Sequence, residues 1–278
     1  MPAAFLFMLG VAIYSFTAGD TQAALHHMLS PDWGRFGWRG AIEALHQAFF
    51  TMALGLGAMV AYGSYLPAQA PVLRMAAGVV VIDTLFSLVA GGTLYALIFA
   101  AGLDPAPGLT LLFQVFPLAL SHGPATDGNA TVIYLVMFMI TLTAAAALME
   151  PAVRYLVERV RVTRVSAAMS CAILIWFLGL GTLLSFNIME SIEIFGRTFF
   201  DWLQWLTGRV LLPLGGLLLC VFVSRILPDQ LLDEMWGTSA PRMLKVWKGL
   251  LRFPARVCLI VLLLYCVGAI DFLVQLWS

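Results

Sequence analysis

The sequence predicts an all-α integral membrane protein with seven transmembrane helices. Of the 278 residues, 62% are hydrophobic and only 11% are charged, and the mean hydropathy is +0.95. A soluble domain of this length cannot bury so much apolar surface. The apolar residues instead form runs of about 20, the length with which a helix crosses the hydrocarbon core of a bilayer. A lipid bilayer is therefore the first expected partner.

The composition argues against several other classes. The formal net charge is zero and no basic block is present, so a nucleic-acid partner is not expected. No P-loop, HExxH or GxSxG motif occurs in a plausible context, which argues against an enzyme and against an organic cofactor. The first apolar run lacks a basic leader, so no cleavable signal peptide is expected. Neither the cysteines nor the histidines have the spacing of metal ligands. The cysteines are expected to be small buried packing residues and the histidines surface or interfacial residues: Cys171, Cys220, Cys258, Cys266, His26, His27, His46 and His122.

Seven apolar stretches make up one transmembrane domain over residues 1–278. Their expected limits are about 2–18, 42–66, 74–101, 131–153, 166–187, 205–227 and 254–276. The loops 67–75, 154–165 and 225–256 hold 11 of the 15 basic residues, and the opposite side holds 4. Because Lys and Arg are enriched in cytoplasmic loops, this asymmetry predicts a cytoplasmic N-terminus and, with seven spans, a C-terminus outside. The long outer loops, 19–41 and 102–130, fit ordered lids or vestibule walls, and their length also fits plain connectors.

The second span, residues 42–66, is interrupted near its centre. Thr51 is followed closely by the run Ala53-Leu54-Gly55-Leu56-Gly57, so a hydroxyl and two glycines lie at mid-membrane. Glycine weakens a helix where lipid offers no partner to an unsatisfied backbone group. Such a break is stable only where it faces protein or a wet cavity, and in transporters the freed carbonyls and amides bind substrate and ions. The segment therefore predicts a discontinuous transporter helix.

Polar side chains within the spans are a second indication, namely Gln47, Thr51, Asp83, Ser87 and Thr143. A carboxylate inside a membrane is costly, so Asp83 favours a functional role over a structural hydrogen bond to a neighbouring helix. Thr51 becomes a candidate cation ligand because it lies beside the break, and hard cations prefer hydroxyl and carbonyl oxygens. Glu150 and Pro151, by contrast, are interpreted as structural, with Glu150 paired to an interfacial arginine and Pro151 marking a kink.

The second span closely resembles helix 6 of the neurotransmitter:sodium symporters, above all of their bacterial amino-acid transporters, in the run EALHQAFFTMALGLGAMVAYGSYL. The likeness continues in order along the chain. PDW at 31–33 resembles the loop after helix 5, VVVIDTLFSLVAGG helix 7, FQVFPLAL the loop before helix 8, and TLTAAAALMEP helix 8. FDWLQWLTGRVLLPLGGLL resembles helix 10, and LLRFPARV the entry to helix 11. The resemblance implies the C-terminal part of the five-plus-five inverted-repeat (LeuT-type) fold, helices 5 to 11, with helices 1 to 4 absent.

The resemblance also implies roles for individual residues. The substrate-binding positions match Phe50, Thr51, Ala53, Leu56 and Leu148. The unwound part of helix 6 matches Gly55 and Gly57. The first sodium site matches Thr51 and Asp83, and the second matches Ile140, Thr143 and Ala144. The second site is weakened, because alanine stands at 144 where serine is usual. The equivalent of the chloride site matches Gln47, Thr51, Asp83 and Ser87, and Asp83 can supply the negative charge itself, as in chloride-independent bacterial members.

The expected function is that of the C-terminal part of a sodium-coupled symporter for neutral, hydrophobic amino acids in the bacterial inner membrane, with Na+ as the coupling ion. Helix 1 supplies most of the other sodium ligands in this family, so the chain is expected to need an N-terminal part, helices 1 to 4. The expected partners are the amino-acid substrate and either an N-terminal transporter fragment or further copies of this chain in a homo-oligomer. Gln204 stands where helix 10 usually has an Asp, so the usual outer ion pair with helix 1 cannot form. The alternative is a non-transporting truncated relic or membrane interaction subunit; a seven-span receptor is disfavoured by the cytoplasmic N-terminus.

Overall fold

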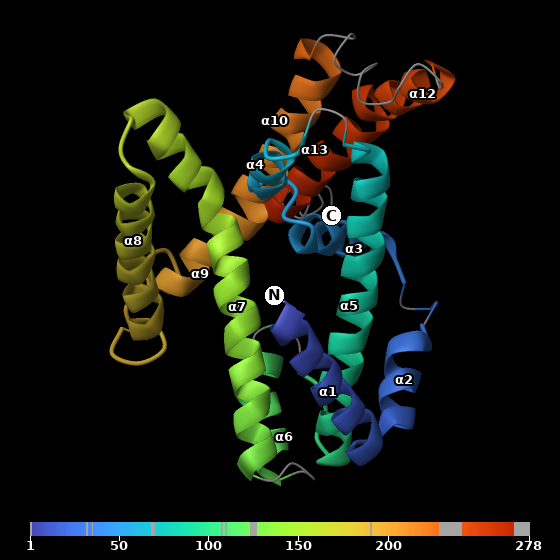
Figure 1. Ribbon diagram of the computed structural model, residues 1–278. Coiled ribbons are helices and arrows are strands. Elements are labelled where there is room, and N and C mark those ends of the chain that lie inside the picture. Colours follow the sequence, from blue (N-terminus) through green and yellow to red (C-terminus); the bar gives the residue numbers. More distant parts are fainter. Residues whose placement is uncertain are drawn as a thin grey trace. The chain divides into compact units, whose positions relative to one another are not determined.

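The computed structural model describes residues 2–31, 33–34, 36–67, 70–106, 108, 110–122, 127–189, 191–227 and 241–269 (Figure 1). In chain order the helices are α1 (Pro2–Ala18), α2 (Thr21–Leu29), α3 (Trp38–Thr51), α4 (Ala58–Gly63), α5 (Val72–Ala100), α6 (Phe116–His122), α7 (Asp127–Tyr155), α8 (Arg164–Leu184), α9 (Phe199–Gln204), α10 (Leu212–Val221), α12 (Pro241–Arg252) and α13 (Pro254–Val267). Wider π-helical turns adjoin them at η1 (Leu111–Val115), η2 (Leu156–Val160), η3 (Trp205–Leu211) and η4 (Phe222–Ile226). Within these ranges the structure has no β-strand, and the predicted all-α membrane fold is confirmed.

Five stretches of helix in the described part of the chain are long and apolar enough to cross a membrane. They are Val72–Ala100, Ala130–Val160, Arg164–Leu184, Phe199–Ile226 and Lys245–Val267. Two shorter apolar helices are Phe5–Ala18 and Leu111–His122, and the latter lies in what the sequence predicts as an outer loop. Several predicted features fall outside the described residues: Asp32 of the PDW run, residues 228–240 of the basic loop and residues 270–276 of the seventh predicted span.

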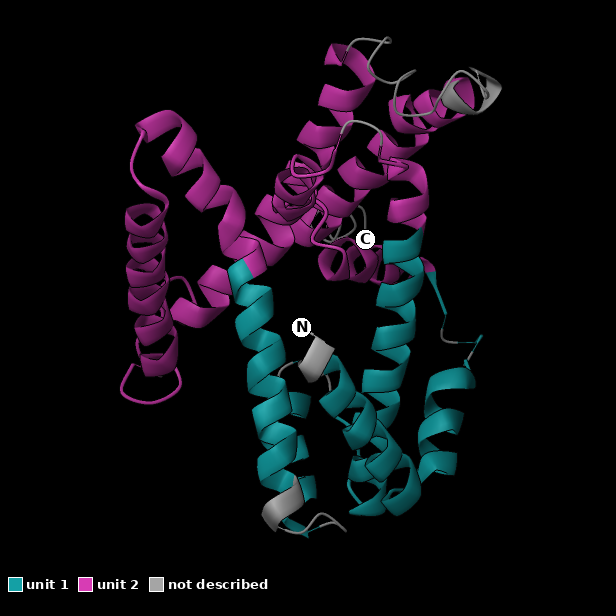
Figure 2. Cartoon of the chain, in the orientation of Figure 1, with its two compact units in different colours: residues 1–37, 78–146 teal, residues 38–77, 147–278 magenta. Residues whose placement is uncertain are grey.

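The chain divides into two compact units (Figure 2). The first unit holds residues 1–37 and 78–146, and the second holds residues 38–77 and 147–278. Two long helices, α5 and α7, pass from one unit into the other along the chain. The residues of the predicted sites are therefore divided between the units, with the broken helix in the second.

In the first unit, α1 and α5 approach closely at small residues. The backbone N–H of Asp20 donates a hydrogen bond to the carbonyl of Ala96 at 2.9 Å. A Cβ atom at Gly92 would lie 3.0 Å from the ring of Phe16, so a larger residue there would push the helices apart. The side chain of Asp20 also caps α2 by accepting from the N–H of Ala23 at 2.9 Å. The core of this unit is formed by Met8, Val11, Leu97, Ile98, Phe116, Ala119, Leu120, Ile133 and Val136.

In the second unit, the main core lies between α10 and α13, and α3 packs onto it. Its buried members are Cys220, Leu259, Leu262 and Cys266, with Ile42, Leu45 and Phe49 of α3 packed against them. Three cysteines are buried as predicted, whereas Cys258 is exposed and the prediction for it is wrong. Cys258 lies on a face of α13 that no described neighbour covers. The sequence alone does not show which face of this helix packs against the protein.

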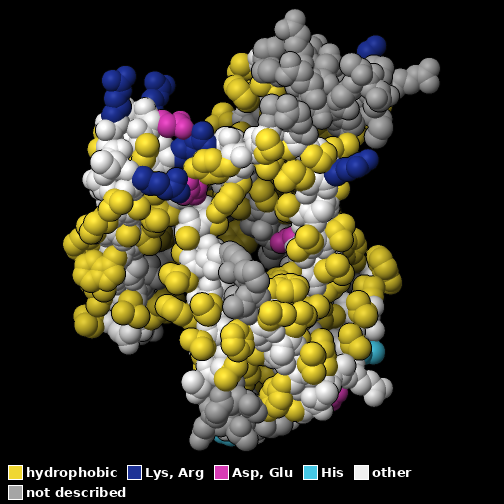
Figure 3. Space-filling view, viewed as in Figure 1, with side chains coloured by type: hydrophobic (Ala, Val, Ile, Leu, Met, Phe, Trp, Pro, Cys, Tyr) yellow, Lys and Arg dark blue, Asp and Glu magenta, His cyan; other side chains and the backbone are white. Residues whose placement is uncertain are grey.

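Large apolar side chains cover much of the molecular surface (Figure 3). Ile13, Ile82, Leu174 and Leu218 are each more than 60% exposed, although all four lie within helices. Soluble proteins rarely leave so much contiguous apolar surface uncovered. The surface is therefore that of a chain whose helices face lipid.

Candidate transport site

The break that the sequence predicts lies between α3 and α4. The first helix ends at Thr51, the second begins at Ala58, and residues 52–57 between them form turns. The backbone is left-handed at three points, with φ of 50° at Ala53, 133° at Gly55 and 80° at Gly57. Glycine adopts these angles at little cost, whereas a residue with a Cβ atom is strained by them. The two glycines therefore permit the chain to leave the helix here and start again in a new direction.

Protein backbone, not lipid, faces the break on one side. A Cβ atom at Gly55 would overlap the carbonyl oxygen of Leu212 in α10 and lie 2.9 Å from the amide nitrogen of Gly216. A Cβ atom at Gly215 would in turn overlap the carbonyl oxygen of Gly55. On another side, Gly57 lies against Pro151 of α7. A Cβ atom added at Gly57 would lie 3.5 Å from the Cβ of Pro151. Other helices thus cover the interruption on two sides, which helps to stabilise an interrupted backbone in a membrane.

Local hydrogen bonds hold the broken segment in one shape. The N–H of Ala53 donates to the carbonyl of Phe50 at 3.0 Å, and the N–H of Leu54 donates to the carbonyl of Phe49 at 3.1 Å. The N–H of Leu56 donates to the carbonyl of Ala53 at 3.3 Å. Each of these carbonyls retains a second lone pair, so the segment presents oxygen atoms that can also accept from a substrate or coordinate a cation.

The predicted site residues fall into both units. Asp83, Ser87, Ile140, Thr143 and Ala144 belong to the first unit, and Gln47, Phe50, Thr51, Ala53, Gly55, Leu56, Gly57 and Leu148 belong to the second. All of them are partly or fully exposed. Because Thr51 and Asp83 lie in different units, the first sodium site and the chloride-site equivalent stay predictions. The second sodium site, within one unit, also stays a prediction.

Two of the predicted sodium ligands bond to their own helices in this structure. The hydroxyl of Thr51 donates to the carbonyl of Ala48 at 3.3 Å, and that of Thr143 donates to the carbonyl of Met139 at 2.8 Å. Such bonds are common for threonine in helices. A hydroxyl that donates to a carbonyl still has lone pairs on its oxygen, so both side chains remain able to bind a cation.

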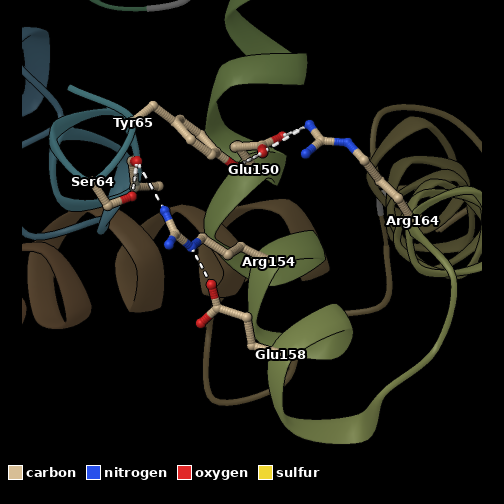
Figure 4. A network of polar contacts seen from close by, with 7 residues as sticks. Ser64, Tyr65, Glu150, Arg154, Glu158 and Arg164 are labelled. Carbon is tan, nitrogen blue, oxygen red and sulfur yellow. Dashed lines mark hydrogen bonds and ion pairs between the residues drawn. The ribbon is translucent and has the colours of Figure 1, made fainter. Parts of the chain in front are cut away.

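A polar network braces the segment after the break, and the sequence predicted only its pairing of Glu150 with an arginine (Figure 4). The hydroxyl of Tyr65 donates to the carboxylate of Glu150 in α7 at 2.5 Å. Arg164 of α8 donates to both oxygens of the same carboxylate, at 2.8 and 3.0 Å. This ion pair confirms the prediction that Glu150 pairs with an arginine. Glu150 therefore connects the end of the broken segment to α7 and α8 at one point.

A second ion pair lies one helical turn further along α7. Arg154 donates through Nε to Glu158 at 2.6 Å, and its Nη1 lies 3.5 Å from the carbonyl of Ala61 in α4. The Arg154 guanidinium also lies 4.9 Å from the centre of the Tyr65 ring, a cation–π contact. The i,i+4 spacing of Arg154 and Glu158 is visible in the sequence. The contact between Arg154 and α4 cannot be read from the sequence, because it depends on the direction that the chain takes after the break.

The other end of the broken helix is held by hydrogen bonds to η3 and α13. Nε2 of His46 lies 2.9 Å from the carbonyl of Gly208, which is in the π-helical turn η3. The hydroxyl of Tyr265 in α13 donates to Glu43 at 3.0 Å. Gln204, the residue that ends α9, directly precedes this turn. α3 is therefore fixed on one side by α10 and α13 and their flanking turns, while its terminal residues at the break remain accessible.

A helical membrane protein in which one chain segment is interrupted between α3 and α4 and braced at both ends has the architecture typical of discontinuous-helix membrane transporters. The model of the sodium:neurotransmitter symporter family matches residues 1–274. The chain belongs to this family. Its members are transporters, and the prediction that the chain is not an enzyme is confirmed.

Individual relatives agree with this assignment. The chain is 32% identical to the uncharacterized sodium-dependent transporter YhdH of Bacillus subtilis, over 98% of its own length and 61% of the relative's. It is 27% identical to an uncharacterized sodium-dependent transporter of Haemophilus influenzae, over 94% of its length and 58% of the relative's. Its structure is similar to that of MhsT in complex with L-phenylalanine, with a TM-score of 0.81 and 30% identity over 96% of this chain and 61% of MhsT. The chain thus spans about three fifths of the length of each of these three relatives.

Proposed function

We propose that the chain is the C-terminal part of a sodium-coupled symporter for neutral, hydrophobic amino acids in the bacterial inner membrane. It works together with an N-terminal part that supplies helices 1 to 4. The observation that carries the proposal is the partly enclosed break at residues 52–57, where left-handed Ala53, Gly55 and Gly57 free backbone groups inside the membrane. The likeness to MhsT, whose structure contains L-phenylalanine, supports an amino acid as substrate.

The residues around the break support an apolar substrate. Phe50, Ala53, Leu56 and Leu148 have no charged or hydroxyl group, so they would receive a small to medium apolar side chain. Phe50 is 54% exposed and Leu148 is 47% exposed. Both side chains therefore remain available for contact with a further helix packed beside the break. This openness supports the need for an N-terminal part.

Sodium is the proposed coupling ion, as the names of the relatives suggest. In the proposed arrangement, Thr51 and Asp83 contribute to a first sodium site, and the Ile140 carbonyl with Thr143 contributes to a second. Ala144 adds no hydroxyl to the second site. Gln47 and Ser87 lie in the neighbourhood where related proteins hold chloride, and the Asp83 carboxylate takes the place of that anion. Sodium binding at Thr51 stabilises the break in the shape that holds substrate, so the two ligands favour each other.

The proposed orientation places the N-terminus in the cytoplasm and the C-terminus outside. It rests on the 11 basic residues in loops 67–75, 154–165 and 225–256 against 4 on the other side. Labelling of single cysteines from either side of intact cells tests it. A cysteine at Arg159 should react only with a permeant reagent, and reaction with an impermeant reagent would reverse the orientation.

Equilibrium binding tests the proposed function. The chain is co-purified with an N-terminal segment comprising helices 1 to 4 of a relative, and L-phenylalanine binding is measured with sodium and with potassium. The proposal expects binding that requires both segments and is strengthened by sodium. Equal binding in potassium would contradict sodium coupling. A folded complex that binds no neutral amino acid would favour the alternative, a truncated relic or membrane interaction subunit, which the loss of a hydroxyl at Ala144 also fits.

A further inference from the structure

The helix α12 (Pro241–Arg252) has a strongly divided surface. Its sequence, PRMLKVWKGLLR, contains no Asp or Glu. Lys245, Lys248 and Arg252 are spaced i, i+3 and i+7, so they lie along one side of the helix. Val246 and Leu250 are spaced i, i+4 and lie on another side. A helix with a basic face and an apolar face of this kind is typical of a membrane–water interface.

The apolar face of α12 is only partly used for packing. Leu251 packs against the core between α10 and α13, and its carbonyl accepts a hydrogen bond from the thiol of Cys220 at 3.0 Å. Val246 is 63% exposed, Leu250 is 53% exposed and Phe253, directly after the helix, is 75% exposed. One edge of the helix is therefore anchored to the protein, while a neighbouring apolar stripe has no cover from the described residues.

The position of α12 along the chain puts this stripe beside the membrane. It precedes α13 (Pro254–Val267), an apolar helix, and the two are separated by Phe253, whose φ and ψ are −122° and −68° (Figure 1). The stretch Lys245–Val267 is apolar enough on average to cross a membrane. If all of it crossed, Lys248 and Arg252 would enter the hydrocarbon, at a cost of several kcal/mol. A crossing that starts near Pro254 avoids this cost and leaves α12 at the surface.

We propose that α12 lies in the membrane–water interface and docks on anionic phospholipids. Val246, Leu250 and Phe253 enter the boundary of the acyl chains, and the side that carries Lys245, Lys248 and Arg252 meets the headgroup phosphates. Charge complementarity selects this occupant. The α12 sequence itself contains no Asp or Glu, so its basic side attracts a negative surface. The apolar stripe beside it, which the described residues leave uncovered, needs a hydrophobic phase. The proposal requires a membrane-spanning chain and does not depend on transport.

The test places a fluorescent reporter on the apolar stripe of the full chain in vesicles. Cys258 is exposed, so Cys258→Ser removes the competing thiol, and Leu250→Cys carries an environment-sensitive label. Accessibility to acrylamide, an uncharged quencher, is compared between vesicles of phosphatidylcholine alone and vesicles containing one third phosphatidylglycerol. The label should be several-fold better protected with phosphatidylglycerol. A label at Arg159→Cys, in the exposed connection between α7 and α8, should be equally accessible in both lipids.

Charge variants decide whether α12 itself recognises the anionic lipid. Each basic residue near an anionic surface contributes a factor of about five in membrane binding. Lys245→Gln with Arg252→Gln should therefore abolish most of the protection that phosphatidylglycerol gives. The matched control, Arg159→Gln with Arg161→Gln, removes two exposed positive charges from the connection between α7 and α8 and should leave the protection unchanged.

Two outcomes overturn the proposal. Protection that is equal in both lipids and insensitive to the α12 charge variant would mean that protein, not lipid, covers the stripe. Protection that falls equally in the control variant would mean that net charge, not this helix, draws the protein to anionic lipid. Circular dichroism and gel filtration of each variant confirm that the fold is intact before labelling.

Discussion

Tyr65 and Glu150, separated by 85 residues, meet through a 2.5 Å hydrogen bond from the phenol to the carboxylate. Glu150 also binds Arg164, and its side chain is only 14% exposed. This carboxylate thus connects three segments of the second unit: the end of the broken helix, α7 and α8. The segment after the break is therefore fixed by a specific polar contact as well as by its close packing.

Removing the phenol should loosen this connection. Tyr65→Phe keeps the ring and its contact with Arg154 but leaves Glu150 with one donor fewer. A hydrogen bond to a charged group contributes roughly 1.5–3 kcal/mol, and the remaining ion pair with Arg164 should offset part of the loss. We expect a lower melting temperature in detergent than for Tyr62→Phe, a matched change near the end of α4, three residues before Tyr65. Equal melting temperatures would show that the bond contributes nothing to stability.

The close contact at the break should make Gly55 irreplaceable. Gly55→Ala adds a Cβ that overlaps the Leu212 carbonyl and forces a residue with a side chain to φ of 133°. Strain and overlap together should destabilise the fold by at least about 2 kcal/mol. The control is Gly63→Ala, where nothing lies within 4 Å of the added atom. Yield of monodisperse protein and thermal unfolding measure the difference, and similar values for both variants would contradict the packing against α10.

Sodium binding at the break should depend on the hydroxyl of Thr51. In the complex with an N-terminal part, Thr51→Val keeps the shape of the side chain and removes the ligand. Sodium affinity should fall about tenfold or more, and substrate affinity should fall with it, because the coupling between two ligands is reciprocal. Thr84→Val is the matched control, since the Thr84 hydroxyl bonds only to its own helix at 2.9 Å from the Val80 carbonyl. Unchanged sodium dependence in the Thr51 variant would exclude it as a ligand.

The carboxylate of Asp83 should replace chloride. If it balances the charge of bound sodium, Asp83→Asn leaves a cation uncompensated at a site of low dielectric. Uptake by the variant complex should be lost in gluconate and partly restored in chloride, whereas the unaltered complex works equally in both. Asp104→Asn, in an exposed loop, should show no effect of either anion. A structural hydrogen-bonding role for Asp83 predicts instead a variant that responds the same way to chloride and gluconate.

Local patterns predicted the parts of this molecule that depend on neighbours in sequence. The all-α membrane fold follows from apolar runs, and the break follows from Gly55 and Gly57 beside Thr51. The pairing of Glu150 with an arginine was also predictable, because carboxylates at the ends of spans seek basic partners. The ion pair of Arg154 with Glu158 was not predicted, although its i,i+4 spacing in the sequence is that of a helical ion pair.

Features that depend on distant contacts were not predictable. The hydrogen bond between Tyr65 and Glu150 depends on the direction that the chain takes after the break. The exposure of Cys258 depends on which face of α13 other helices cover. The apolar helix at Leu111–His122 lies in a segment rich in Pro and Gly, so its sequence indicated a loop. The sodium sites were predicted from family resemblance. The first combines Thr51 and Asp83, which belong to different units, whereas the residues of the second all belong to the first unit.

Sodium-driven uptake in proteoliposomes tests the central claim most directly. The 278-residue chain is reconstituted alone and together with an N-terminal segment of helices 1 to 4, and uptake of a labelled neutral amino acid is followed under an inward sodium gradient. We expect no uptake above that of empty vesicles for the chain alone. For the two segments together, we expect uptake that is lost when the sodium gradient is removed. Robust sodium-driven uptake by the chain alone would contradict the need for an N-terminal part. Absence of uptake from a folded two-part complex would contradict the assignment as a symporter.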